Sequence, residues 1–254
     1  MNATSKDGTA IAYDRAGDGP AVVLVGGGLD DGAENAPLAA ELAARFDVIN
    51  YARRGRGGSG DTPPYAVERE IEDLDALIAA AGGSAHVLGV SSGGALALEA
   101  AAAGSAIDRL AVYDVPYPIG RTEEWRRYRE QLAAALAEAR RGDALELFMR
   151  LAGSSEEGIA GARASDLWPG LEALAPTLAY DAACLGDGRP PAERLAAIAR
   201  PTLVLTGGGD DFFGPAADAV AAAVPGADRA TLGDQGHVAD PKALAPVLTR
   251  FFAG

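Results

Sequence analysis

Short apolar runs alternate with segments of helical periodicity along most of this 254-residue chain. Runs such as PAVVLVGGG (residues 20–28) and PTLVLTGGG (residues 201–209) are continuous and rich in β-branched residues. Strands that are apolar on both faces are typical of parallel sheets covered by helices. The alternation therefore predicts an α/β protein with an open, doubly wound, mostly parallel sheet.

The individual elements are read from this alternation. An alternating N-terminal segment contains Asp7-Gly8, which is typical of a two-residue hairpin turn. The expected strands that follow cover residues 20–28, 46–52, 86–91, 108–115, 201–209 and 227–234. The expected helices cover residues 36–44, 67–81, 93–103, 215–224 and 241–252.

The alternation is interrupted once, between Val115 and Pro201, where the pattern is mostly helical. We therefore predict one α/β core formed by residues 1–115 and 201–254, with a helical insertion over residues 116–200. An insertion at this point follows the carboxyl end of a strand. It would cover the edge of the sheet where α/β proteins bind their ligands.

Charge and composition exclude several classes of function. The formal net charge of −14 argues against nucleic acid as a partner, because phosphates would be repelled. A single cysteine, Cys184, excludes an internal disulfide, and the two histidines, His86 and His237, leave too few ligands for a usual zinc site. No signal-peptide-like or membrane-spanning apolar stretch occurs, so we expect a cytoplasmic protein without a membrane partner. Whether copies associate into a homo-oligomer stays open.

A glycine- and serine-rich corner separates an expected strand from an expected helix. Gly89-Val90-Ser91-Ser92-Gly93 matches the pattern G-x-S-x-G in this context. Such a turn forces the serine into a strained backbone conformation, and the flanking glycines relieve the crowding. Ser91 would then stand at the top of the sheet beside a helix N-terminus, which favours developing negative charge. The alternative is a tight turn without chemistry.

A serine hydroxyl needs a base within hydrogen-bond reach to become a nucleophile. His237 lies in the loop between the last strand and the last helix, which returns to the carboxyl edge of the sheet. It is the expected base. His86 begins the strand that leads to Ser91, so it lies at the opposite end of the sheet, and we expect a structural role for it.

The base needs a carboxylate to hold its tautomer and to stabilise the imidazolium. Asp210 and Asp211 follow the strand that precedes His237, and we favour Asp210. The glycine run before them leaves the register ambiguous, so Asp211 is an alternative. Asp114, at the end of the expected strand 108–115, is a further contender.

A tetrahedral intermediate needs two amide donors. The N–H of Ser92, directly after the nucleophile, would supply one. The other is expected from Gly28, with Leu29 in reserve, in the glycine-rich loop after the first long strand. A phosphate cradle is the competing interpretation, but GGGLDD lacks the third glycine of G-x-G-x-x-G and places Asp30 and Asp31 where phosphate would bind.

In this order of motifs, the chain resembles the α/β-hydrolase fold family over nearly its whole length. The segments that carry the resemblance are LVGGGL, YARRGRGGSG, GVSSGG, PTLVLTGGGDD and GDQGHVADP. The resemblance implies an eight-stranded, mostly parallel sheet, a helical cap over about residues 116–200, and a covalent acyl-enzyme route without a cofactor.

The chain departs from the family pattern at three places. Gly26-Gly27 stands where His-Gly is common, and Val90 stands where a larger polar residue often precedes the serine. Ala52 takes the place of the aspartate in Asp-x-Arg-Gly, whose arginine is Arg54. We expect weaker local support around Arg54 as a result.

The leading hypothesis is a serine hydrolase that cleaves an ester, lactone or related acyl bond of a small, fairly apolar molecule. Apolar residues of the insertion would form its pocket, although most such residues pack a cap onto its core. The candidates are Trp125, Tyr128, Phe148, Met149, Leu151, Trp168 and Leu171. The alternatives are a non-hydrolytic enzyme on the same fold (a lyase, cyclase or cofactor-free oxygenase of natural-product metabolism) or a non-catalytic small-molecule-binding protein.

Overall fold

The computed structural model describes residues 1–209 and 212–254. The strands are β1 (Asn2–Thr4), β2 (Ala10–Ala16), β3 (Ala21–Val25), β4 (Asp47–Tyr51), β5 (Ala85–Val90), β6 (Ile107–Tyr113), β7 (Thr202–Thr206) and β8 (Asp228–Thr231). The helices that flank them are α1 (Ala36–Leu42), α2 (Val67–Ala80), α3 (Ser92–Ala103), α10 (Phe213–Ala223) and α11 (Pro241–Phe252). The segment from β6 to β7 contains α4 (Thr122–Ala137), α5 (Arg141–Leu151), α6 (Glu156–Arg163), α7 (Trp168–Leu174), the 3-10 turn η1 (Ala175–Thr177), α8 (Leu178–Cys184) and α9 (Ala192–Leu195).

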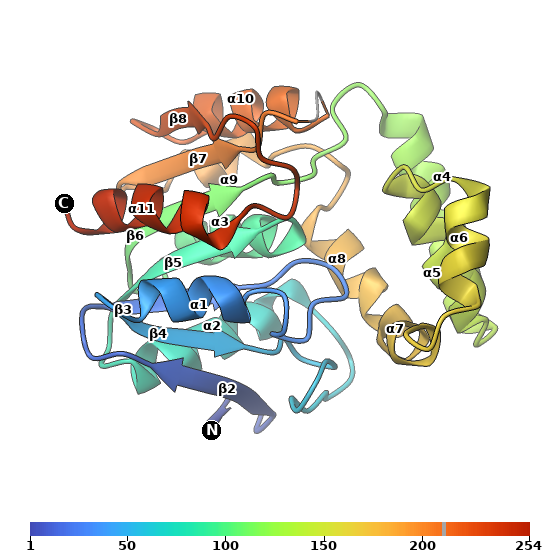
Figure 1. The fold of residues 1–254 in the computed structure, drawn as a ribbon, viewed down its shortest axis with the longest axis horizontal. Coiled ribbons are helices and arrows are strands. Elements are labelled where there is room, and N and C mark those ends of the chain that lie inside the picture. Colours follow the sequence, from blue (N-terminus) through green and yellow to red (C-terminus); the bar gives the residue numbers. More distant parts are fainter. Residues whose placement is uncertain (210–211) are drawn as a thin grey trace.

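Within the described residues, these strands form one eight-stranded sheet in the order β1-β2-β4-β3-β5-β6-β7-β8. β2 runs antiparallel to β1 and to β4, and the other neighbouring pairs are parallel. The predicted doubly wound, mostly parallel sheet is therefore confirmed (Figure 1). The segment between β6 and β7, which the sequence predicts to be mostly helical, contains α4 to α9 and no strand among the described residues.

Helices cover both faces of the sheet because its central strands are apolar on both sides. Val22 and Leu24 of β3 point to the face covered by α1 and α11, while Val23 and Val25 point to the face covered by α2, α3 and α10. All four of these side chains are fully buried. Successive side chains of a strand alternate between faces, so a continuous apolar run requires a helical layer on each side.

Most of the segment between β6 and β7, from α4 to α8, forms a separate group of helices at one edge of the sheet, whereas α9 packs against α3 and α10. Figure 1 shows α4, α5, α6 and α7 beyond the carboxyl end of β6, with α8 between them and the sheet. α8 packs against α3, the helix that begins directly after Ser91. The insertion is thereby placed over the edge at which the sequence expects the catalytic residues.

The N-terminal hairpin differs from the expected two-residue turn. Residues 5–9 connect β1 to β2, and the N–H of Ser5 donates to the carbonyl of Thr9 at 2.8 Å. Gly8 adopts the left-handed conformation (φ 87°) that the Asp-Gly pair predicted, but inside this wider loop. One Asp7 carboxylate oxygen accepts the N–H of Thr9 and the other accepts from Arg54, so the loop is built around this carboxylate.

The expected weak support around Arg54 is wrong. The guanidinium is completely buried and forms a bidentate pair with Asp73 of α2, with both N–O distances at 2.7 Å. A third contact, to Asp7, is 3.0 Å long. Two carboxylates from outside the turn therefore compensate for Ala52, which replaces the aspartate common in the family.

Replacing Asp73 by asparagine tests this pair. The substitution removes the charge that compensates the buried Arg54, so we expect a loss of about 3–5 kcal/mol in the free energy of unfolding. Glu72→Gln is the matched control, because Glu72 is only partly buried and pairs with Arg69 and Lys6 at the surface, so the substitution should cost at most about 1 kcal/mol. Urea denaturation measures both. Equal losses would show that the buried pair has no special importance.

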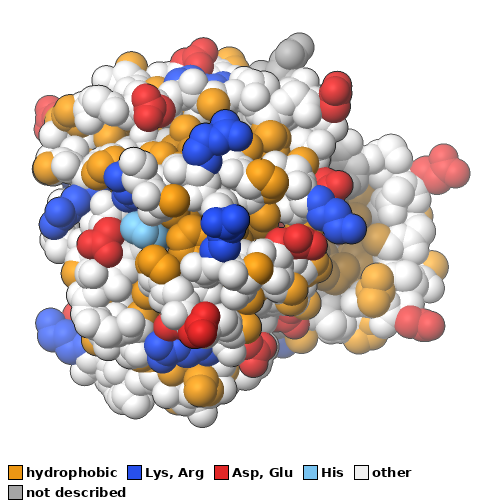
Figure 2. Space-filling model, turned by 60° about the vertical axis from the view of Figure 1, so that its left-hand side comes forward, with side chains coloured by type: hydrophobic (Ala, Val, Ile, Leu, Met, Phe, Trp, Pro, Cys, Tyr) orange, Lys and Arg blue, Asp and Glu red, His pale blue; other side chains and the backbone are white. Residues whose placement is uncertain are grey.

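Charges of both signs are interspersed over the side of the molecule drawn in Figure 2, with apolar side chains between them. In the part of the chain that the structure describes, no helix is both long enough and apolar enough to cross a membrane.

Candidate active site

Ser91 occupies a strained turn between β5 and α3. Its backbone angles are φ 54° and ψ −128°, a region that side-chain-bearing residues rarely adopt. The turn is tight because neighbouring backbone fills the space around it. A Cβ on Gly89 would lie 2.6 Å from the carbonyl oxygen of Gly93, and a Cβ on Gly93 would lie 2.4 Å from that of Gly26. Any side chain at Gly89 or Gly93 would therefore collide with backbone atoms, so both positions require glycine.

Gly93→Ala should therefore destabilise the protein, because the added methyl group meets rigid backbone. We expect a loss of about 1–3 kcal/mol in the free energy of unfolding. Gly161→Ala in α6 is the control, since a Cβ there meets nothing within 4 Å and alanine favours a helix by up to about 1 kcal/mol. The prediction fails if urea denaturation shows that Gly93→Ala is as stable as the wild type.

His237 faces a buried carboxylate at the same edge of the sheet. Its Nδ1 lies 3.3 Å from Oδ2 of Asp114, a residue only 1% exposed that follows β6 in a left-handed conformation (φ 48°). The other oxygen of Asp114 accepts the N–H of Gly207 at 3.0 Å, which fixes the carboxylate. The Phe213 ring stacks on the imidazole at 4.6 Å between centroids. The imidazole is thus held by both its edge and its face.

Asp114, one of the alternatives that the sequence left open, is therefore the carboxylate that the structure places against His237. The favoured Asp210 and its neighbour Asp211 lie outside the described residues. The sequence could not choose among them for a geometric reason. β6 and β7 are adjacent parallel strands, with Tyr113 opposite Leu205, so residues that follow either strand reach the same edge.

His86 lies elsewhere, as expected. It stands near the start of β5, and its ring stacks on Phe252 with centroids 4.9 Å apart. Phe46 packs edge-on against the same ring. Burial lowers the pKa of His86 and so favours its neutral form.

A cavity of about 410 Å³ lies between the insertion and the strand-to-helix turn at Ser91, which we call the elbow. Ser91 and His237 both line it, as do Gly28 and Ser92. The insertion contributes Trp125, Tyr128, Phe148 and Leu151 from the predicted set, together with Leu178, Asp181, Ala182 and Leu185. The expected nucleophile, base and oxyanion residues therefore meet at one mostly apolar cavity.

The prediction that Trp168 lines the substrate pocket is wrong, because Trp168 does not line this cavity. It is buried within the insertion itself, where the guanidinium of Arg163 lies 5.8 Å from its ring centroid. Its helix, α7, lies at the lower end of the insertion in the view of Figure 1. Met149 and Leu171 are likewise absent from the lining. Helical periodicity identifies an apolar face but does not distinguish packing within a cap from contact with a ligand.

The glycine-rich loop after β3 passes directly beside the nucleophile. A Cβ on Gly27 would lie 2.8 Å from Cβ of Ser91, and the next residue, Gly28, lines the cavity. Leu29, the reserve candidate, has φ 62° and does not line it. Asp30 is buried, and one of its oxygens accepts the N–H groups of Gly32 and Glu34. Because the carboxylate of Asp30 already accepts from these two N–H groups, they are not available to bind a phosphate, which disfavours a phosphate cradle.

A buried group of charges beneath the elbow was not found from the sequence. Arg53 forms a bidentate pair with Glu70, both distances being 2.7 Å, and also contacts Asp181 of α8 at 2.8 Å. Arg56 contacts Asp181 at the same distance, and the hydroxyl of Ser92 donates to it at 2.7 Å. The core, the elbow and the insertion therefore meet at this carboxylate. A lone aspartate in the apolar segment LAYDAAC was the one available signal.

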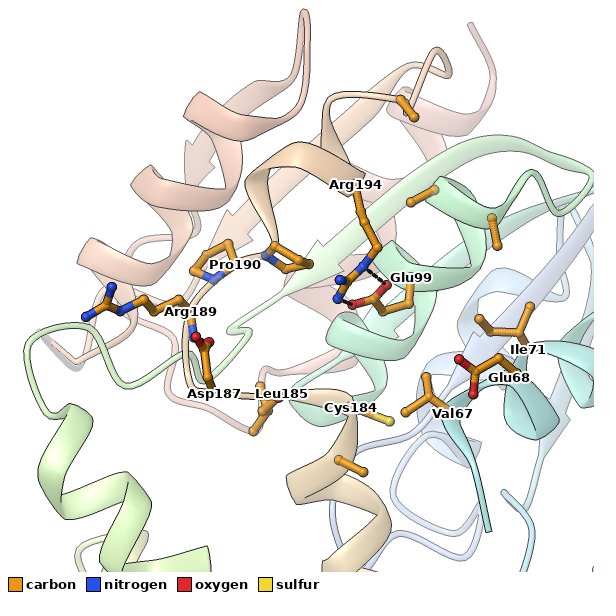
Figure 3. A pocket seen from close by; sticks show the side chains of 16 residues that line it. Val67, Glu68, Ile71, Glu99, Cys184, Leu185, Asp187, Arg189, Pro190 and Arg194 are labelled. Atoms are coloured by element: carbon orange, nitrogen blue, oxygen red, sulfur yellow. Dashed lines mark hydrogen bonds and ion pairs between the residues drawn. The ribbon is translucent and has the colours of Figure 1, made fainter. Parts of the chain in front are cut away.

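A larger and more open hollow of about 890 Å³ lies between α2, α3 and the chain that follows α8 (Figure 3). Its most prominent polar feature is the ion pair between Arg194 and Glu99, at 2.7 Å. Neither Ser91 nor His237 lines it, so the smaller cavity is the candidate active site. Among the described residues, no cluster of three or more His, Cys, Asp or Glu side chains is arranged to hold a metal ion.

Comparison with known proteins identifies the family to which this chain belongs. The model of the alpha/beta hydrolase family matches residues 21–247. A pimeloyl-[acyl-carrier protein] methyl ester esterase of Xanthomonas campestris pv. campestris is 34% identical over 93% of this chain and 96% of its own length. The chain therefore belongs to the alpha/beta hydrolase family, and it is an enzyme of that class.

Solved structures extend the likeness. An alpha/beta hydrolase from Sphaerobacter thermophilus is 49% identical, with a TM-score of 0.90 over 99% of this chain and 100% of that one. A thermophilic esterase from Thermogutta terrifontis is 26% identical, with a TM-score of 0.72 over 100% of this chain and 97% of that one.

Proposed function

We propose that this protein is a serine hydrolase that cleaves a carboxylic ester of a small molecule through an acyl-enzyme intermediate. One observation carries the proposal: Ser91, on its strained turn, lines the same cavity as His237, whose imidazole is paired with the buried Asp114. The esterase relatives from Xanthomonas campestris and Thermogutta terrifontis support the choice of an ester bond.

Each group has one role in the proposed mechanism. His237 accepts the proton of the Ser91 hydroxyl as the oxygen attacks the ester carbonyl. Asp114, at Nδ1, holds the tautomer that leaves Nε2 free to act as base, and it stabilises the imidazolium that forms. The N–H groups of Ser92 and Gly28 stabilise the negative oxygen of the tetrahedral intermediate.

The intermediate then collapses, and His237 returns the proton to the departing alcohol. A water molecule, deprotonated by the same imidazole, attacks the acyl-enzyme, and the second tetrahedral intermediate releases the acid and regenerates Ser91. No step requires a cofactor. The apolar walls formed by Trp125, Tyr128 and Phe148 fit a small acyl or alcohol group.

Labelling with a fluorophosphonate probe tests Ser91 as the nucleophile. We expect the wild-type protein to be labelled on Ser91 and Ser91→Ala to be unlabelled, with labelling of His237→Ala much reduced because the hydroxyl then has no base. Ser84→Ala is the control, since Ser84 is exposed and precedes the other end of β5. A folded protein that the probe does not label would instead favour non-catalytic ligand binding.

Asparagine substitutions decide which carboxylate serves the base. Asp114→Asn should lower kcat/KM for p-nitrophenyl esters by about 10³–10⁴-fold, because the amide no longer holds the imidazole in the required tautomer. Asp210→Asn and Asp211→Asn should leave most of the activity. A collapse of activity in either of these, with Asp114→Asn active, would move the role of the acid to the end of β7 and leave the rest of the mechanism intact.

A further inference from the structure

Asp181 presents one carboxylate oxygen that the buried charge group does not use. Oδ1 accepts from Arg53 and Arg56 at 2.8 Å each and from the hydroxyl of Ser92 at 2.7 Å. Oδ2 has no hydrogen-bond partner among the described residues, although Asp181 is only 6% exposed. Buried carboxylate oxygens normally have partners, so an unpartnered one next to a cavity indicates a place for a ligand.

The free oxygen lies beside the expected oxyanion loop. A Cβ on Gly28 would be 3.3 Å from Oδ2 of Asp181 and 3.5 Å from Cζ of Phe148. Asp181, Gly28, Ser92 and Phe148 all line the active-site cavity. Oδ2 itself has almost no accessible surface, so a ligand group reaches it only when the Phe148 ring moves aside, and that group then lies next to Gly28 of the oxyanion loop.

The charges around Asp181 decide what kind of group this is. Burial opposes ionisation, but the guanidinium groups of Arg56 and Arg53 hold the pKa of Asp181 below its ordinary value, so Oδ2 is a pure acceptor. Arg53 and Arg56 are balanced by Glu70 and Asp181. Nε of Arg56 is also without a partner among the described residues, but Arg56 does not line the cavity. A ligand there meets an unpartnered carboxylate oxygen, which favours a hydrogen-bond donor.

We propose that Oδ2 of Asp181 accepts a hydrogen bond from a hydroxyl or ammonium group on the acyl chain of the substrate, within a few bonds of the scissile carbonyl. The inference rests on the proposed ester hydrolysis and narrows its substrate class from carboxylic esters of small molecules to hydroxyacyl or aminoacyl esters. The aromatic walls then contact the remainder of the molecule.

A matched pair of esters tests this specificity. Methyl 3-hydroxybutanoate and methyl butanoate differ by one hydroxyl, and the released acid is followed by pH-stat titration. A hydrogen bond to a charged group in a dry site favours the hydroxylated ester by roughly tenfold to a hundredfold in kcat/KM. Equal rates, or a preference for methyl butanoate, overturn the inference.

Two variants remove the acceptor in different ways. Gly28→Ala leaves every ion pair in place and puts a methyl group 3.3 Å from Oδ2, so the ratio of the two kcat/KM values should fall close to one whatever happens to the absolute rates. Asp181→Asn should also abolish the preference, provided that circular dichroism shows it to be folded. Asp187→Asn, at an exposed position just after α8, should keep the wild-type ratio.

The outcomes distinguish a failure of the role proposed for Asp181 from a failure of the serine hydrolase proposal. Hydrolysis of both esters without a preference overturns the role of Asp181 and leaves the serine hydrolase standing. A preference that Gly28→Ala retains likewise overturns it, because the hydroxyl must then bind elsewhere. Failure to hydrolyse either ester, with Ser91 unlabelled by the fluorophosphonate, overturns both.

Discussion

The architecture of the site depends on steric exclusion where three backbone segments meet. The end of β3, the turn at Ser91 and the first turn of α3 approach so closely that a Cβ at Gly93 would overlap carbonyl oxygens of Val25 and Gly26. This close approach forces the serine into its strained conformation and brings the oxyanion loop beside it. The geometry of Ser91 and the oxyanion loop is therefore a consequence of close packing in the core.

The buried charges add a second constraint by joining parts of the chain that are far apart in the sequence. Arg53 follows β4, Glu70 belongs to α2, and Asp181 belongs to the insertion, yet their side chains form one connected group. Isolated charges in such a place would be unfavourable, so each carboxylate requires its arginine. The hydroxyl of Ser92 bonds to the same Asp181, which ties the insertion to the residue next to the nucleophile. Cap and turn are thus positioned relative to each other by electrostatics.

Prediction from the sequence succeeded for features that local backbone preference determines. It failed for features that depend on how the helices of the insertion pack against one another and against the core. The strand before Ser91, the helix after it and the loop around His237 follow from periodicity and turn chemistry. Trp125 and Trp168 show the limit. Both lie on apolar helical faces of the insertion, but only the first of the two lines the cavity. Their different roles depend on how the helices pack together, which periodicity does not describe.

The sequence by itself determined the alternating elements, the corner at Ser91 and the small set of residues able to serve it, because these depend on residues close together in the chain. Tertiary structure placed Asp114 against His237, brought Asp181 beneath the turn and supplied Asp73 and Asp7 to Arg54. Each of these contacts joins elements whose relative position is set by the packing of the whole sheet and its helices. No local pattern records that packing.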